Sequence, residues 1–536
     1  MSRLFVVFSV LFSWSWSGVS HAQDFHFEGD VPEGPDTFFF LEFEVPEGVA
    51  EIEVVHTHIP VDTDNVLDWG VDDPNGSRGW GGSNNEDTVI GVEAASRNYI
   101  PGPMPAGTWW VSVGKARLVD GEPAGYSVDV FLRETATLVP QPRAPYQDPG
   151  VINTEARWYA GDFHVHTRES GDTRSTLTLD EALTFATGQG LDFVMLSEHN
   201  TNSGFTLYED VRPRYPTLLI FPGQEFTTYK GHANAIGALE NVDYTVDTGG
   251  YTIEDAIRAF QAQGAVFSIN HPSIPLPDCR GCSWDFEDFD PTLIGAVEVQ
   301  TAILRGIIFW EDLLDAGSRA TALGGSDDHR AGQNLGAVDR PIGTPTTMVF
   351  AESLSVDAIL EAVRSGRTTV KLTGPSAPML DTTMTGERVG NTVFADRATL
   401  RAEVTDGEGF TLRVIKNRES IQSIRIDGSP FIFEAEVEAP SEGADRYRHE
   451  LVNEGGPQTL SSYVWLEKGT APPVGGSGGN GGTAGTGAGG NAATGGSGGD
   501  DGGSGCSVQT SAHGAWLGLG MLLGWALFRR RARRIR

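Results

Sequence analysis

The stretch GDFHVHTRESGD, residues 161–172, places two histidines on alternate positions of a short apolar run and an aspartate six residues after the second one. Alternate residues of a β-strand point to the same face, so His164 and His166 can bind one metal ion. A lone H-x-H pair is weak evidence, because buried histidines are often hydrogen-bonded to the backbone. The surrounding sequence therefore has to show whether this pair belongs to a larger site.

Short apolar runs alternate with helical stretches from about Trp158 to Gly374. The runs are FHVHT, LDFVMLSEH, LLIFPGQEF, AVFSINHP, GAVEVQT, ATALGGSDDH and TTMVFA. Helical stretches such as LTLDEALTFATGQG and YTIEDAIRAFQAQG open at a threonine with an acid three residues later, which is typical of a capping box. This alternation predicts a parallel α/β structure in the form of a barrel.

Metal-binding residue types stand at the ends of five of these runs. They are His164 with His166, His199, Glu225, His271, and Asp327 with His329. In an α/β barrel the strand ends converge on one rim, so these side chains are expected to meet in one cup. Imidazole and carboxylate groups suit zinc, manganese and iron. The sequence therefore predicts a metal centre, because core packing does not explain so many such clusters at strand ends.

The regions on either side of the predicted barrel have sequence patterns that predict β-strands. Residues 23–150 and 376–469 contain short alternating runs separated by glycine, proline, aspartate and asparagine, which predicts two β-sandwiches, the second of them small and Ig-like. A second H-x-H pair, His56 and His58, has no carboxylate cluster near it and is interpreted as two strand-face histidines.

Tryptophans in the first predicted sandwich offer two interpretations. Trp80, Trp109 and Trp110 could form a sugar-binding platform, but packing is the interpretation we favour.

The two ends of the chain indicate export. Residues 1–22 have the charge, apolar run and small residues of a signal peptide. Residues 470–505 are a Gly-rich linker, and residues 506–536 hold a short apolar segment followed by RRRARRIR. The apolar segment, Ala515–Phe528, is shorter than the roughly 20 residues of a membrane helix. It favours a processed sorting tail over an ordinary membrane anchor, and resembles myxobacterial C-terminal sorting signals in which a cysteine, here Cys506, is the processing point.

From its two ends, we expect an exported protein at the cell surface or outer envelope, attached to the membrane or envelope through its tail or released after processing.

The charge of the chain excludes one class of partner. The net charge of −34 argues against binding to nucleic-acid duplexes, whose phosphates are also negative. The length of 536 residues predicts two or three domains, and the oligomeric state stays open.

The motifs DFHVHT with SGD, SEHN, GQEFTT, GHANAIG, INHP and GGSDDH resemble, in this order, those of the polymerase-and-histidinol-phosphatase (PHP) metallohydrolases. RGWGG and PIGTPTTMVFA resemble the CehA/McbA branch, named for carbaryl-type carbamate hydrolases. The resemblance implies a distorted (β/α)7 barrel over residues 151–375, flanked by the two sandwiches.

The resemblance also implies a set of metal ligands in three groups. The first group is His164, His166, Glu225 and Asp327; the second is Glu225, as a bridge, with His232 and His271; the third is Asp172, His199 and His329. Two or three divalent ions, Mn, Zn or Fe, are expected. Glu169 is an alternative to Asp172, and Asp328 is expected to be a loop or salt-bridge residue.

The expected function is metal-dependent hydrolysis of a small-molecule phosphate ester, carbamate or related ester by a metal-activated hydroxide. The catalytic residues are expected to be Glu225, as the bridge, and His199 or His329, which would protonate the leaving group if the third site is empty. Metal-bound water would protonate it if that site is filled. The alternative is a non-catalytic, metal-stabilised surface binding protein whose sandwiches hold glycan or a partner.

Four further features lie close to the motifs. Arg168, Lys230 and Arg330 are candidates for binding an anionic substrate, although cations in such loops are usually solvated or paired. Cys279 and Cys282 are expected to form a disulfide after export.

Overall fold

The computed structural model describes residues 24–82, 86–172, 176–273, 280–299, 305–333 and 340–470, all of which lie within one compact unit. This multidomain part of the chain is mostly β, with five sheets and few helices. The predicted signal peptide and the chain from residue 471 onward, which contains the predicted sorting tail, lie outside the described residues. None of the helices in the described ranges is long and apolar enough to cross a membrane.

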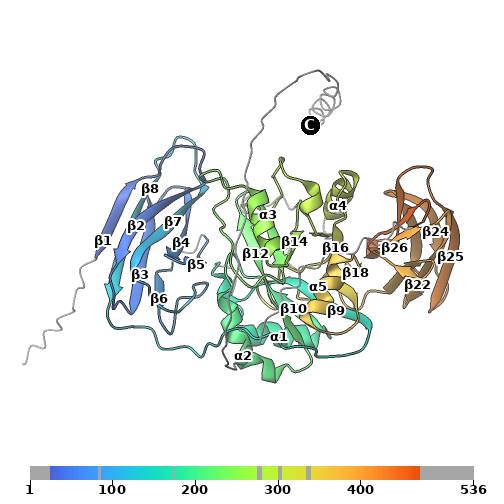
Figure 1. Ribbon diagram of the computed structural model, residues 1–536, viewed down its shortest axis with the longest axis horizontal. Helices are drawn as coiled ribbons and strands as arrows, with labels where there is room; N and C mark the ends of the chain where they lie inside the picture. The colour runs from blue at the N-terminus through green and yellow to red at the C-terminus, as the bar shows by residue number, and fades with distance from the viewer. Residues whose placement is uncertain are drawn as a thin grey trace, which may run out of the picture. The chain divides into compact units, whose positions relative to one another are not determined.

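The N-terminal region consists of two four-stranded antiparallel sheets, drawn in blue in Figure 1. Their strand orders are β1-β8-β3-β6 and β2-β7-β4-β5. The strands are β1 (Phe25–Asp30), β2 (Phe38–Val45), β3 (Glu51–Ile59), β4 (Val66–Asp73), β5 (Gly76–Trp80), β6 (Thr88–Gly91), β7 (Gly107–Arg117) and β8 (Gly125–Arg133). Apolar residues alternate along these strands, and their inward side chains, including Trp69 and Trp109, share one core. Two sheets packed on a common core form a β-sandwich.

The central region contains two further sheets. One has the order β11-β10-β9-β17-β18 and continues beyond β18, and the other has the order β12-β13-β14-β15-β16. The strands are β9 (Arg157–Val165), β10 (Phe193–Leu196), β11 (Leu219–Phe221), β12 (Gly223–Thr228), β13 (Gly231–Ile236), β14 (Val266–Ile269), β15 (Ala296–Glu298), β16 (Thr321–Leu323), β17 (Thr346–Ala351) and β18 (Thr368–Lys371).

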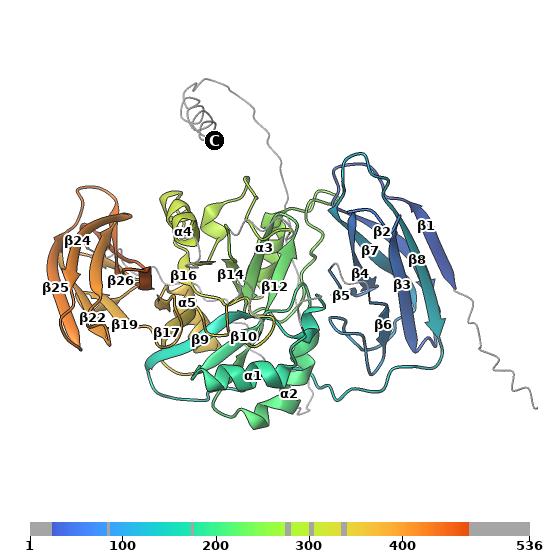
Figure 2. The ribbon, with the colours of Figure 1, turned by 180° about the vertical axis from the view of Figure 1, so that it is seen from behind.

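Helices cover these two sheets. They are α1 (Leu179–Gly188), α2 (Tyr208–Val211), α3 (Ile253–Ala262), α4 (Arg305–Asp315) and α5 (Val356–Arg364), with 3-10 turns η1 (Arg168–Ser170), η2 (Ser203–Leu207), η3 (Arg212–Arg214) and η4 (Pro291–Leu293). Helix α1 packs against β10, and α5 packs against β17, as Figures 1 and 2 show. The threonines at the starts of α1 and α3 form capping boxes, Thr178 with Glu181 and Thr252 with Asp255, which confirms the predicted helix starts.

The central strands do not form a single closed parallel barrel within the described ranges. The strands β12 and β13 pair antiparallel, and so do β13 and β14. The reason is local: only Tyr229 and Lys230 separate β12 from β13, and a two-residue turn is too short for the crossover that parallel strands require. Isolated bridges, Val165 with Asp328 and His199 with Glu225, connect the two sheets instead of a continuous ladder. The sequence runs were therefore recognised as strands, but β13 and the mixed strand directions were missed.

The C-terminal region shares a sheet with the central region. Strand β18 pairs with β27, which extends the sheet through β26, β23 and β24, and β21 and β28 lie beside this path. A second sheet has the order β20-β19-β22-β25 and packs against it. The strands are β19 (Met379–Met384), β20 (Glu387–Arg388), β21 (Thr392–Phe394), β22 (Arg397–Thr405), β23 (Thr411–Lys416), β24 (Glu419–Arg425), β25 (Phe431–Glu438), β26 (Ala444–Asn453), β27 (Gly456–Ser461) and β28 (Val464–Glu467).

Candidate metal centre

The ends of the central strands bring the predicted ligands together. His164 is the penultimate residue of β9 and His166 follows that strand, so both side chains point to the same side. Their rings are fully buried. The other predicted ligands come from β12, from β13 and from the loops that follow β9, β10, β14 and β16. Residues that are up to 165 positions apart in the sequence thus meet at one place, since the first is His164 and the last is His329.

The first group of ligand atoms has the spacing of donors around one ion. The Nε2 atoms of His164 and His166 are 3.1 Å apart. Asp327 Oδ1 lies 3.3 Å from the first of these nitrogens and 3.2 Å from the second. Donors that each lie 2.0–2.1 Å from a tetrahedral zinc ion are roughly 3.3 Å from one another. These three side chains therefore fit one divalent ion, and they form one of the three candidate metal groups among the described residues.

Glu225 lies between the first and second groups. Its Oε1 atom is 3.2 Å from His164 Nε2, 3.4 Å from His232 Nδ1 and 3.4 Å from His271 Nε2. Its Oε2 atom is buried and has no hydrogen-bond partner of acceptable geometry, although His199 Nδ1 is only 2.7 Å away. A buried carboxylate oxygen without a hydrogen bond needs a compensating charge. A cation at this place supplies that charge, so the carboxylate fits the role of a bridge.

The third group lies nearer to solvent. His166, His199 and His329 form a candidate metal group, and the rings of His199 and His329 both lie beside the His166 ring, at centroid distances of 4.4 and 4.3 Å. Asp172 Oδ2 is 3.8 Å from the Nε2 atoms of both His199 and His329. The side chain of Asp172 is 21% exposed and that of Asp327 is 26% exposed, whereas His164, His166 and Glu225 are fully buried. The open side of the cup is therefore the side of Asp172 and Asp327.

The second ring nitrogens of these histidines are held from outside the cup. Glu298 Oε1 accepts from His164 Nδ1 at 2.7 Å, and Ser170 Oγ lies 2.7 Å from His166 Nδ1. Backbone carbonyls do the same for three others: Arg280 O for His232, Cys282 O for His271 and Asp327 O for His329. His199 differs, because its Nδ1 atom lies 2.8 Å from the hydroxyl of Thr227. Metal-binding histidines show this arrangement, because the outer partner orients the ring and sets which nitrogen is free to coordinate.

Backbone strain also concentrates at the cup. His271 and Asp327 have positive φ angles of 26° and 55°. Such conformations cost energy in residues other than glycine, and they persist where the surrounding structure requires them, which is common at functional sites.

Burial and the neighbouring charges shift the pKa values of the clustered residues in different directions. Burial disfavours the charged form of His164, but Glu298, Glu225 and Asp327 outweigh that effect and raise its pKa well above the usual value. Burial and the neighbouring His329 and His199 lower the pKa of His166 to about 3, so this ring is neutral at pH 7 and able to coordinate. The pKa of Glu225 is held well below its usual value, against the effect of burial, by His164, His232 and His199.

Residues close to the motifs but outside the cup have other roles. Glu169 pairs with Arg143 at 3.4 Å, so Asp172 is the acid of the SGD segment that reaches the histidines. Asp328 accepts the backbone N–H groups of Arg330, Gly332 and Ile342, as expected of a loop residue.

Two of the three predicted substrate-binding cations, Lys230 and Arg168, have other surroundings than the cup, and the role of Arg330 stays a prediction. Lys230 is paired with Asp247 at 2.8 Å, and Arg168 is exposed and lines a hollow with Arg143 and Arg214 rather than the cup. Cys282 is disulfide-bonded, while Cys279 lies outside the described residues.

Glu298 is the supporting residue that sequence reasoning missed. It is buried on β15, and besides His164 it accepts the backbone N–H of His271 at 2.9 Å. A Cβ atom at Gly325 would lie 2.1 Å from Glu298 Oε1, which explains the need for glycine at that position of GGSDDH. The available signal was a carboxylate inside the apolar run GAVEVQT, because strand interiors seldom bury an acid without a partner.

We expect Glu298→Gln to weaken metal binding about 10- to 100-fold, because the neutral amide holds His164 less firmly and no longer stabilises its ligand form. Competition with a chelator measures this affinity. Glu352→Gln is the matched control, since Glu352 is exposed and loses the same charge. An unchanged affinity in Glu298→Gln would show that Glu298 does not act on the metal centre.

Comparison with known proteins finds similarity only to solved structures, and at low sequence identity. No protein-family model matches the chain, and no curated protein sequence matches it. Among solved structures, the chain is similar to a two-domain protein from Bacteroides vulgatus that contains a predicted PHP-like metal-dependent phosphoesterase, with 18% identity, a TM-score of 0.31, and coverage of 61% of this chain and 100% of that one. It is also similar to the CARDB domain of a Pyrococcus furiosus protein, with 13% identity, a TM-score of 0.13, and coverage of 18% of this chain and 97% of that one.

Proposed function

We propose that this protein is an exported metal-dependent hydrolase of phosphate esters, built on a PHP-type centre and held at the cell surface by its C-terminal tail. One observation carries the catalytic part of this proposal: Glu225 lies between two groups of ligands, with His164, His232 and His271 all within 3.4 Å of the same oxygen. The order of the motifs from DFHVHT to GGSDDH supports the family, and the signal-like residues 1–22 support export.

The exposure of the ligands favours an enzyme over a metal-stabilised scaffold. Structural metal sites are closed by protein ligands, whereas catalytic sites keep a position open for water or substrate. Asp327 and Asp172 are partly exposed, so the cup is open on one side. A substrate can therefore approach the ligand groups from that side.

Divalent ions in such a cup lower the pKa of water and neutralise the charge that develops on a phosphoryl group. The chain itself supplies three things. Glu225 keeps the two neighbouring groups of ligands together, and the buried His164 and His166 are oriented by Glu298 and Ser170. Asp172 and Asp327 border the side from which substrate enters.

His199 fits the role of proton donor to the leaving group. Burial opposes its charged form, but Glu225 and Asp172 outweigh burial and raise the pKa of His199 to about 8. When the third group holds no ion, the ring therefore carries a proton at neutral pH, and its Nε2 atom faces Asp172 at the open side of the cup.

A phosphoryl group suits the spacing better than a carbonyl group does. It carries charge on several oxygens, and ligand groups that adjoin one another can neutralise more than one of them. A carbonyl has one oxygen to polarise. The carbamate activity suggested by the motifs RGWGG and PIGTPTTMVFA is therefore the alternative that an assay must test.

The test uses the chain from residue 23 to residue 472, the end of the compact unit. The purified protein is loaded with manganese, zinc or iron and assayed with p-nitrophenyl phosphate, bis(p-nitrophenyl) phosphate and 1-naphthyl N-methylcarbamate. We expect turnover of at least one phosphate ester that a chelator abolishes and metal restores. Turnover of the carbamate alone would replace phosphate esters with carbamates, and no turnover by fully loaded protein would favour the binding protein.

A further inference from the structure

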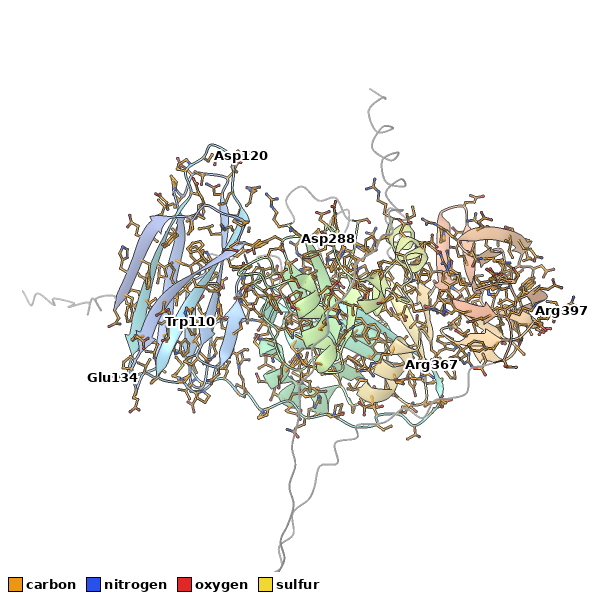
Figure 3. The ribbon with its side chains drawn as sticks, turned by 45° about the horizontal axis from the view of Figure 1, so that its top comes forward. Trp110, Asp120, Glu134, Asp288, Arg367 and Arg397 are labelled. Carbon is orange, nitrogen blue, oxygen red and sulfur yellow. The ribbon has the colours of Figure 1, made fainter. Side chains whose placement is uncertain are left out.

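The outer face of one sandwich sheet carries a row of side chains that lie next to one another across the strands. Trp110 of β7 is opposite Asp72 of β4, and Asp72 is opposite Ser77 of β5. Paired residues of antiparallel strands point to the same face, so these three side chains share one surface. Phe40 of β2 belongs to the same face, because its partner in β7 is Ser112, two residues from Trp110. Figure 3 shows Trp110 on this part of the sandwich.

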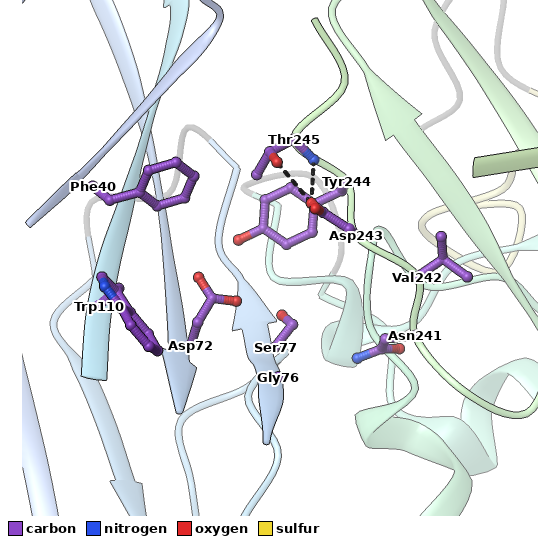
Figure 4. Close-up of a pocket in the computed structure, with 10 residues that line it drawn as sticks. All are labelled: Phe40, Asp72, Gly76, Ser77, Trp110, Asn241, Val242, Asp243, Tyr244 and Thr245. Atoms are coloured by element: carbon purple, nitrogen blue, oxygen red, sulfur yellow. Dashed lines mark hydrogen bonds between the residues drawn. The ribbon is translucent and has the colours of Figure 1, made fainter. Parts of the chain in front are cut away.

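A loop of the central region covers this face and leaves a cavity. Tyr244 lies over Gly70, where a Cβ atom would be 2.0 Å from the tyrosine hydroxyl oxygen. That hydroxyl is 2.9 Å from Ser112 Oγ, so a hydrogen bond joins the two regions. The cavity between the sheet face and residues 241–245 has a volume of about 490 Å³, and Figure 4 shows the side chains that surround it. This volume is within the usual range for small-ligand sites.

The cavity combines aromatic surface with uncompensated negative charge. Phe40 is 46% exposed and Trp110 is half-buried, although apolar rings of this size are usually covered. Asp72 and Asp243 also line the cavity, and no Lys, Arg or His is among the described residues that do so. Neutral groups hold both acids: Ser112 Oγ donates to Asp72 at 2.9 Å, and the backbone N–H and hydroxyl of Thr245 donate to Asp243.

Asp243 lies close enough to Asp72 to oppose the ionisation of Asp72. Burial raises the pKa of Asp72 to about 6, and the nearby carboxylates of Asp243 and Asp73 add to the rise. A cation placed between Asp72 and Asp243 would relieve this repulsion, whereas an anion would increase it. The charge of the cavity therefore selects a positive ligand.

We propose that this cavity binds a guanidinium group, carried by a small molecule or by an arginine side chain of a partner. A guanidinium is planar, so it can stack on an aromatic ring while its N–H groups reach carboxylates, which matches Trp110 and Phe40 beside Asp72 and Asp243. It is also weakly hydrated compared with an ammonium group and enters a half-buried site at lower cost. This site goes beyond the proposed hydrolase function and does not depend on it, because none of the proposed metal ligands lines the cavity.

The test measures direct binding to the chain from residue 23 to residue 472 by isothermal titration and saturation-transfer NMR. N-ethylguanidinium is compared with N-ethylurea, which has nearly the same shape but no charge, and with methyl glucoside. We expect saturable binding of N-ethylguanidinium alone, weakened by added salt. A blocked Gly-Arg-Gly peptide distinguishes an arginine of a partner protein from a small-molecule guanidinium. Tighter binding of the peptide than of N-ethylguanidinium indicates a protein partner, and weaker binding indicates a small molecule.

Two variants locate the site. Asp72→Asn keeps the shape and the acceptor for Ser112 but removes the charge, and we expect about tenfold weaker binding. Trp110→Leu removes the stacking surface, and we expect binding about three to thirty times weaker. Asp120→Asn is the control, because Asp120 is an exposed loop residue of the same sandwich and loses the same charge (Figure 3).

The Asp72→Asn variant is expected to be at least as stable in its folded state as the unchanged protein. An acid with a raised pKa in the folded state destabilises the fold once it is ionised above that pKa, so a neutral side chain removes this cost at pH 7. Equal binding of N-ethylurea, preferential binding of methyl glucoside, or unchanged affinity in a folded Asp72→Asn would each overturn the proposal.

Discussion

Glu225→Gln is expected to lower the bound metal by more than one equivalent and to abolish hydrolysis. A carboxylate shared by two ions offsets their mutual repulsion, so its loss affects both. In this protein one oxygen of Glu225 lies within 3.4 Å of His164, His232 and His271, and the other lies 2.7 Å from His199. Glutamine keeps the size of the side chain and still accepts from Asn270 Nδ2, so the loss is one of charge. Elemental analysis of the purified variant measures the metal content.

His232→Ala is the matched comparison for Glu225→Gln. His232 belongs to one group of ligands, so its loss is expected to remove no more than one ion. Loss of one ion or none in Glu225→Gln, with the circular dichroism spectrum unchanged, would remove the bridge and leave a mononuclear site.

The double variant His164→Ala with His166→Ala is expected to lose most of its metal and all turnover. Both rings are fully buried, their Nε2 atoms are 3.1 Å apart, and each belongs to two of the three candidate metal groups. Their removal therefore leaves no complete group of ligands among the described residues. Metal content and the rate of hydrolysis under saturating metal measure the effect.

The chain contains its own control for this experiment. His56 and His58 form a second H-x-H pair, on β3, and His56 stacks on Trp69 with ring centroids 4.5 Å apart. The same double substitution there costs packing, but it is expected to leave metal content and turnover unchanged. Full metal content in a folded His164→Ala/His166→Ala protein would disprove the assignment of the first group.

Several features of the site could be predicted because they depend on residues close together in the chain. The apolar runs that carry the ligands are strands, and the capping boxes at Thr178 and Thr252 start helices as expected. Strand alternation placed His164 and His166 on one side. Trp109 and Trp80 are buried, so packing was the correct interpretation for both.

Other features could not be predicted because they depend on how distant segments pack. Glu298 lies 134 residues from His164, and a hydrogen bond between them leaves no periodic pattern in the sequence. The choice between Glu169 and Asp172 is decided by Arg143, which pairs with the first of them. The cavity beside Trp110 exists because Tyr244 of the central region is placed over Gly70 of the sandwich.

The sequence by itself determined the kinds of ligand and their positions at strand ends, because hydrophobic alternation and helix capping act over a few neighbouring residues. Only the tertiary structure decided which ring nitrogen of each histidine faces the cup and which side of the cup stays open. Those choices are made by hydrogen bonds and burial between residues far apart in the chain. Examples are Glu298 on His164 and Arg280 O on His232, and their physical cause is that a buried polar group has to find a partner wherever the folded chain supplies one.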